Sequence, residues 1–417
     1  MSGLPELVRR QTGVAEVPLD SASLRQAIFD STLRECTDAF RNRLRALIST
    51  GSLARDEASF LRQENSWAVC GDAEFMVVFE KNAALPATTA LGEIRRRIES
   101  NLLQQNIRCK IDLSAVHPSY FQHLPAHIFT YELKHCGRVI AGDELILQSI
   151  PDYSADSISL EDAWRLLCNR LVEMLECAAE LSGENQAPSP TLRYKILKLY
   201  LDMGSSFLVF LQAYVPTYGE RRDVLLRLSG NNTMIGGYPF ELGTFADVVA
   251  RCTAQKLVPG ASDLTIDLSW LTAIQEAHAL WRWELARLVD VRTELTDLEL
   301  FNKWITLQPF EKRARGWLHI LRACGWRRGY LVLLRWLSLR RASPRHWIYL
   351  VASTLLFQLT AEANSSRTRG RDASYGSLSS YLPVRRMTAK NQQNPSWEDL
   401  AHDVVWNYQQ FLVGTRA

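Results

Sequence analysis

The chain has 417 residues, of which 47% are hydrophobic and 22% are charged, and its formal net charge is +3 at pH 7. This length predicts at least two domains rather than one. The nearly balanced charge argues against a disordered tail protein and against a chain devoted wholly to nucleic acid.

The eight cysteines form no C-x-x-C pair, so we expect reduced thiols rather than a zinc ribbon or a redox motif. The opening MSGLPELVRRQ lacks the apolar region of a secretory signal. The most apolar stretch, Trp347 to Leu359, is shorter than the roughly 20 residues that span a bilayer. We therefore expect a buried helix there, no transmembrane span, and a protein that is cytoplasmic or attached peripherally to a membrane.

The N-terminal third predicts the order helix, strand, loop, strand, helix, strand, which is typical of a small mixed α/β unit. The expected elements are a helix over 20–43, a strand over 44–49, a polar loop over 53–71, a strand over 73–80, a helix over 92–105 and a strand over 108–116.

Strand patterns mostly disappear after this unit. Helices are expected over 159–181 and 191–214, with a linker at 183–190 and a polar loop at 364–380. The predicted fold class is α+β, with a small mixed-sheet domain followed by a mostly helical one. We divide the chain into 1–155 for the sheet domain, 156–300 for a helical partner domain, and 301–417 for a basic, Trp-rich helical region.

Three acidic residues lie on the second and third predicted strands. Because side chains alternate across a strand, Asp72 and Glu74 face the same side. Asp112 lies in an apolar frame on the third strand, where a carboxylate is costly unless it is paired or bound to metal. If the two strands are neighbours, the three carboxylates converge, and their oxygens suit Mg²⁺.

The first predicted strand ends in Gly51 and Ser52. Glycine allows the backbone to approach a phosphate closely, and the amides and the Ser52 hydroxyl can bond its oxygens. A phosphate-binding turn beside a divalent-metal site indicates nucleoside triphosphate chemistry. Two metal ions can stabilise both oxygens of an in-line displacement.

This pattern resembles the polymerase-beta-type nucleotidyltransferase superfamily, in which a Gly-Ser turn precedes Asp-x-Asp/Glu on the next strand and a carboxylate on a later strand. GSLARDE (51–57) is similar to a Gly-Ser-x-x-Arg-Gly-Glu variant of bacterial members, and HIFTYELKHCGRVIAGD (127–143) to a downstream segment of a bacterial subgroup. The resemblance covers about residues 40 to 150. The chain departs from it in a longer gap between Ser52 and Asp72 and in Asp56, which stands where glycine is common.

The resemblance implies that Asp72 and Glu74 hold two Mg²⁺ ions with the triphosphate of an NTP, for which ATP is the expected substrate. It also implies that Asp112 holds the ion beside the acceptor and assists the deprotonation of the acceptor. It implies phosphate contacts from Gly51, Ser52 and Arg55. Lys195 and Lys198, on the helix after the linker, are further candidates for the triphosphate, with a solvated helix face as the alternative.

The predicted activity is transfer of a nucleoside monophosphate from an NTP to an unknown acceptor with release of pyrophosphate. Two alternatives stay open: an oligonucleotide or cyclic-nucleotide synthase, and a non-catalytic protein that senses nucleotide or binds a partner or membrane. The sequence chooses neither the acceptor nor the base, and it leaves the oligomeric state open.

The segment from Lys312 to Arg345 contains ten lysine and arginine residues with interleaved tryptophans. Such a segment suits an anionic membrane surface, RNA or an acidic partner. The alternative is a set of amphipathic helices with arginine in water and tryptophan in the core.

Overall fold

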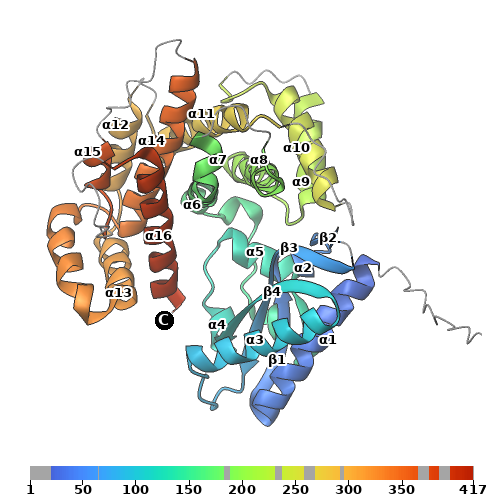
Figure 1. Cartoon of the computed structure of the whole chain (residues 1–417). Coiled ribbons are helices and arrows are strands. Elements are labelled where there is room, and N and C mark those ends of the chain that lie inside the picture. Colours follow the sequence, from blue (N-terminus) through green and yellow to red (C-terminus); the bar gives the residue numbers. More distant parts are fainter. Residues whose placement is uncertain are drawn as a thin grey trace, which may run out of the picture.

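The structure is a computed structural model that describes residues 20–63, 65–182, 188–230, 237–257, 268–291, 295–364, 375–384 and 395–416. The chain is α+β, with a small sheet in its first third and helices in the rest (Figure 1). The two parts meet along one side of the sheet, and the three predicted carboxylates lie on that side.

The sheet has five strands in the order β2-β3-β1-β5, with β4 paired to β3. β3 is antiparallel to β1 and β2 but parallel to β4, and β1 is antiparallel to β5. The sheet is therefore mixed, as expected. Its strands are β1 (Leu44–Thr50), β2 (Ser59–Gln63), β3 (Ser66–Phe79), β4 (Ile107–Val116) and β5 (Arg138–Gly142).

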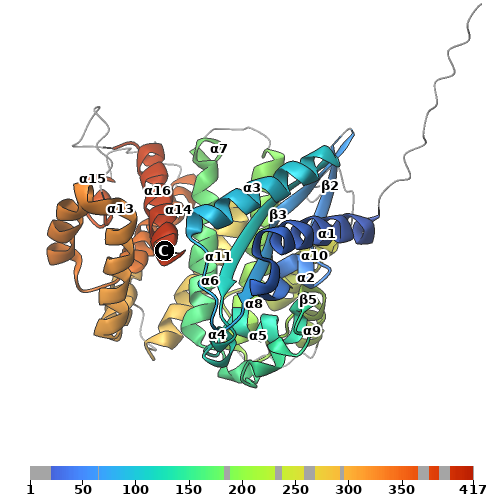
Figure 2. The same ribbon diagram turned by 90° about the horizontal axis from the view of Figure 1, so that it is seen from below.

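Helices cover both faces of the sheet. α1 (Ser21–Phe40) and α3 (Thr88–Gln104) pack on one face, where Phe75 and Val77 point (Figure 2). Met76 and Val78 point to the other face, toward the short helices α4 (Ser119–Gln122) and α5 (Ile128–Cys136). The even-numbered residues of β3 therefore face the helical part of the chain.

The predicted polar loop over 53–71 is wrong. It begins within the short helix α2 (Gly51–Ala54) and contains the strand β2 and the first residues of β3. These two strands form a hairpin. The helical part stabilises this hairpin, because the Tyr194 hydroxyl donates to the Cys70 carbonyl at 2.7 Å and the Ser59 hydroxyl donates to the Lys256 carbonyl at 2.8 Å. These partners are far away in sequence, so local polarity indicated a loop.

The remaining predicted elements of the N-terminal third are confirmed within a few residues. Beyond them the described chain is helical. The helices are α6 (Leu160–Met174), α7 (Ala178–Ser182), α8 (Pro190–Phe210), α9 (Tyr218–Gly230), α10 (Leu242–Leu257), α11 (Trp270–Leu288), α12 (Asp297–Thr306), α13 (Phe310–Leu339), α14 (Pro344–Asn364), α15 (Tyr375–Ser379) and α16 (Trp397–Arg416).

One continuous hydrophobic core joins these helices. At its centre the ring of Trp164 contacts the rings of Trp281, Trp304 and Tyr349, with centroids 6.1, 4.5 and 6.0 Å away. Residues on both sides of position 300 thus share one core, while the buried residues of the sheet form separate clusters.

The apolar stretch 347–359 lies inside α14 and is mostly buried, as expected. In the described ranges, none of the helices is both long and apolar enough to cross a membrane. The predicted loop over 364–380 contains the short helix α15, whereas its residues 365–374 lie outside the described chain, as do residues 183–187 of the predicted linker.

Candidate functional site

Two of the three predicted carboxylates are direct neighbours. Glu74 of β3 is paired in register with Asp112 of the parallel strand β4. Asp72 lies two residues before Glu74 and therefore faces the same side, next to Lys110 of β4. The two strands are neighbours, which was the condition for convergence, and all three carboxylates belong to the face that meets the helical part.

Glu74 is held by the end of β1. The Thr50 hydroxyl donates to Glu74 Oε2 at 3.3 Å. Gly51 has a φ of 64°, and a Cβ atom at this position would lie 2.7 Å from Glu74 Oε2. Glycine is thus needed twice here, for its left-handed backbone and for the space that the carboxylate fills.

The electrostatic environment of Glu74 is unfavourable for its charge. The carboxylate is open to solvent, but protein surrounds it on most sides. This loss of water and then the negative charge of Asp112 raise the pKa of Glu74, against the hydrogen bond from Thr50. A cation between Glu74 and Asp112 would remove the repulsion.

Asp72 has a counter-charge of its own. Lys110 Nζ lies 2.9 Å from Asp72 Oδ2, and both side chains are accessible, at 69% and 35% exposure. Among the described residues, no group of three or more histidine, cysteine or acidic side chains is arranged to hold a metal ion. The face therefore presents Glu74 and Asp112 together, with Asp72 turned to Lys110.

The donor chemistry nonetheless fits a hard divalent cation. Carboxylate oxygens are the ligands that Mg²⁺ prefers, and the strand register already places the three residues on one face. An exposed ion pair contributes only about 0–1 kcal/mol, so releasing Asp72 from Lys110 costs little compared with a metal–carboxylate interaction. Asp72 can therefore join the other two when a cation binds.

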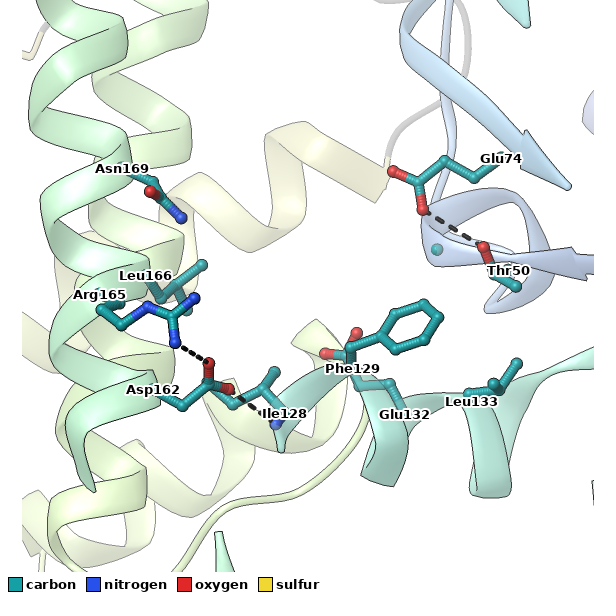
Figure 3. Close-up of a pocket in the computed structure, with 11 residues that line it drawn as sticks. Thr50, Glu74, Ile128, Phe129, Glu132, Leu133, Asp162, Arg165, Leu166 and Asn169 are labelled. Carbon is teal, nitrogen blue, oxygen red and sulfur yellow. Dashed lines mark hydrogen bonds and ion pairs between the residues drawn. The ribbon is translucent and has the colours of Figure 1, made fainter. Parts of the chain in front are cut away.

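Glu74 opens into a cavity of about 210 Å³ between the sheet and α6 (Figure 3). Arg165 and Asn169, one helical turn apart on α6, stand across the cavity from Glu74. Arg165 is 4.0 Å from Asp162, and its buried Nε atom has no hydrogen-bond partner in the described chain. The other lining residues are Thr50, Gly51, Ile128, Phe129, Glu132, Leu133, Asp162 and Leu166.

Sequence reasoning missed Arg165 and Asn169. The available signal was helical spacing, because Asp162, Arg165 and Asn169 are three and four residues apart and therefore share one face of the helix. Hydrogen bonds fix the side chain of Asn169, because its Oδ1 accepts from Arg345 at 3.1 Å and from Tyr408 at 2.7 Å.

Gly51 of α2 lines the cavity, whereas neither Ser52, which follows it in α2, nor Arg55 is among the lining residues. The Arg55 guanidinium is 7% exposed and contacts Glu57 at 2.9 Å and Glu132 at 2.5 Å. The structure thus places Arg55 in an internal ion-pair network and not on the cavity wall. Asp56 has a φ of 62°, a left-handed backbone conformation that favours glycine.

The two predicted lysines also lie away from the cavity. Lys195 Nζ pairs with Glu176 at 2.6 Å. Lys198 Nζ lies 5.9 Å from the centroid of the Tyr194 ring, and burial followed by the charge of Arg170 lowers the pKa of Lys198. Neither side chain is part of the cavity wall that contains Glu74.

Glu132 of α5 connects the sheet part to the helical part. It accepts from Arg55, from the Tyr214 hydroxyl at 2.6 Å and from Arg221. Burial opposes the charge of Glu132, but Arg55 and Arg221 outweigh it and lower the pKa of this carboxyl. Glu57 strengthens the connection by accepting from the backbone N–H of Tyr218 at 2.6 Å. This network fixes the helical wall opposite the sheet.

A second, more open groove of about 650 Å³ adjoins the cavity, and Phe129 lines both. None of the described residues that line this groove is an aspartate, glutamate, lysine or arginine. The hydroxyl of Thr130, which is buried, has no partner in the described part of the chain. The other lining residues are Leu85, Ala115, Val116, His117, Ser119, Tyr120, His123, Leu124, Pro125 and His127.

Comparisons with known proteins found no relative of this chain. No protein-family model matches the chain, and no match was found among curated proteins or among solved structures. The argument for function therefore depends on the geometry of the site and on the sequence motifs.

Proposed function

We propose that this chain is a metal-dependent nucleotidyltransferase that moves a nucleoside monophosphate from an NTP to an acceptor and releases pyrophosphate. The observation that carries the proposal is the register of β3 and β4, which pairs Glu74 with Asp112 and leaves Asp72 on the same face. The turn at Gly51 lies directly against Glu74, so a phosphate-binding backbone and the carboxylates would share one cavity.

Asp72, Glu74 and Asp112 would hold Mg²⁺ beside the triphosphate, and bound Mg²⁺ would supply electrophilic stabilisation of the phosphate oxygens. Gly51 and Ser52 would donate to these oxygens from the end of β1. Asp112 would accept a proton from the acceptor hydroxyl. Arg165 faces the same cavity, and it takes the phosphate-binding role that the sequence suggested for Arg55.

The acceptor would approach through the open groove on the far side of Phe129. Because this groove contains no carboxylate, a polycationic acceptor such as an aminoglycoside gains no charge pairing there. A neutral acceptor with an apolar or aromatic part suits the lining better.

The test is pyrophosphate release from the common NTPs with Mg²⁺ and a mixed acceptor pool. Glu74→Gln and Asp112→Asn should lower the rate by at least about a hundredfold, because each removes a proposed metal ligand. Glu80→Gln is the matched control, since Glu80 directly follows β3 and its side chain is 50% exposed near Arg45, away from the cavity. An equal loss in Glu80→Gln would contradict the assignment.

A second candidate is a protein that binds nucleotide without turnover. The ion pair between Lys110 and Asp72 favours it, because Lys110 supplies a positive charge where a metal ion would otherwise act. Such a protein would bind a non-hydrolysable NTP yet release no pyrophosphate, and Lys110→Ala would weaken this binding. If wild type binds no NTP in the presence of Mg²⁺, both candidates are wrong.

A further inference from the structure

The helix α13 is a helical hairpin at the edge of the molecule, and it takes no part in the site above. At Gly325 the backbone leaves helical geometry, with φ 66° and ψ 175°. This break divides α13 into an inner arm, residues 310–324, and an outer arm, residues 326–339. Figures 1 and 2 both show α13 at the periphery, far from the sheet.

The inner arm is fixed to the body of the protein. The indole N–H of Trp317 donates to the Ala342 carbonyl at 2.9 Å, and His319 contacts the Gly414 carbonyl at 2.9 Å. On the outer arm, Val332 and Leu339 are buried, and Arg335 donates to the Leu382 carbonyl at 2.9 Å. These contacts pack one side of the outer arm against the rest of the protein. The opposite side of the arm therefore has a fixed orientation.

The other side of the outer arm is an exposed apolar stripe. The side chains of Tyr330, Leu333, Leu334 and Leu337 are 61%, 50%, 59% and 58% exposed. Their spacing of three and four residues places them along one helix face. Single exposed leucines are ordinary, but four aligned apolar side chains on a projecting helix indicate a surface that becomes covered.

The segment that contains the stripe is rich in basic residues. The segment 310–345 contains ten lysine and arginine residues and one acidic residue, Glu311. Arg340 and Arg341 are exposed directly after the outer arm, and Arg315 and Arg322 are exposed on the inner arm. An apolar stripe in an arginine-rich segment, followed directly by two exposed arginines, has the composition of a helix that lies in the interface of an anionic membrane.

We propose that the outer arm of α13 binds the surface of an anionic phospholipid membrane, with Leu333, Leu334 and Leu337 entering the acyl region and the neighbouring arginines contacting the headgroups. Three of the four stripe residues are leucines, which offer no hydrogen bond and no aromatic face, so Tyr330 alone could stack on a base and the stripe suits a membrane better than RNA. A projecting convex arm can meet a flat, fluid surface without a complementary groove. The binding is peripheral, and it does not depend on nucleotide transfer.

The test is co-sedimentation of the full chain with vesicles of phosphatidylcholine alone and with vesicles in which phosphatidylglycerol replaces part of it. Wild type should bind the anionic vesicles and release them at high salt. Leu333→Gln with Leu337→Gln should lower the partition coefficient at least about tenfold, because apolar area no longer enters the membrane. Arg340→Gln with Arg341→Gln should lower it by about fivefold for each charge removed.

Leu103→Gln is the matched control, because Leu103 is 56% exposed on α3 and lies outside α13. Glutamine suits a helix about as well as leucine does, so circular dichroism should show all variants folded. Four results would each overturn the proposal: no binding by wild type, equal binding to neutral vesicles, unchanged binding by the double leucine variant, or release of the vesicles by RNA. Self-association that the leucine variant alone abolishes, with no vesicle binding, would identify a second copy as the occupant instead.

Discussion

Glu74 and Asp112 lie opposite each other across the parallel pair of β3 and β4, and the Thr50 hydroxyl donates to Glu74. Parallel register makes this pairing rigid, because neither residue can turn to the other face without moving its whole strand. Two like charges are thus kept together at the expense of stability, which is typical of functional sites.

Mg²⁺ should stabilise the folded chain. A cation between Glu74 and Asp112 relieves their repulsion, and an ion that binds only the folded state adds about 2.7 kcal/mol when its concentration is a hundred times its Kd. Thermal unfolding should therefore shift upward with Mg²⁺ in wild type and in Glu80→Gln, but not in Glu74→Gln or Asp112→Asn. The metal part of the proposal fails if wild type shows no shift.

Gly51→Ala should damage the site more than a comparable glycine substitution. Its new Cβ atom would lie 2.7 Å from Glu74 Oε2, so the carboxylate must move. Gly71 is the control, since its φ of 119° is also positive but a Cβ atom there meets nothing within 4 Å. Both variants should lose about 1 kcal/mol of stability through backbone strain, and only Gly51→Ala should lose NTP binding in a calorimetric titration.

Glu132→Gln should be strongly destabilising. It leaves the guanidinium groups of Arg55 and Arg221, which are 7% and 4% exposed, without this counter-charge. Breaking a buried pair in this way costs about 3–5 kcal/mol, which urea unfolding would measure. Glu220→Gln is the matched variant, because Glu220 is exposed and accepts from Thr217 at the start of α9. Similar losses in the two variants would mean that the network is not structural.

Glu284 should make stability depend on pH. This side chain is fully buried in α11, and burial raises its pKa to about 8 although Ser206 donates to it at 2.6 Å. The folded chain therefore keeps a proton that the unfolded chain releases above the ordinary value of 4.5. The free energy of unfolding should therefore fall as the pH rises from the pKa of Glu284 in the unfolded chain to its pKa in the folded chain, and it should level off above that value.

Glu284→Gln should remove this dependence while keeping an acceptor for Ser206. Relative to wild type, the variant should gain stability between about pH 5 and about pH 8, by up to about 4 kcal/mol. Chemical unfolding at both pH values measures the difference. A difference that stays constant across this range would show that Glu284 is ionised in the folded protein.

The elements with strong local patterns could be predicted from the sequence. Strands β1 and β4 and helices α1, α3, α6 and α8 agree with their expected positions within a few residues. The carboxylates could be found because alternation along a strand places Asp72 and Glu74 on one face. The hairpin of β2 and β3 could not be found, since its partners Tyr194 and Lys256 come from the helical part.

The sequence by itself determined the strand and helix order, the acidic residues and the glycine turn, because these follow from periodicity and residue type. Only the tertiary structure decided which charged side chains meet. It placed Arg55 against Glu57 and Glu132, turned Asp72 to Lys110, and put Arg165 across the cavity from Glu74. The physical reason is that an ion pair depends on the distance between atoms in the folded chain, and residues such as Arg55 and Glu132 are brought together by packing and not by any local pattern.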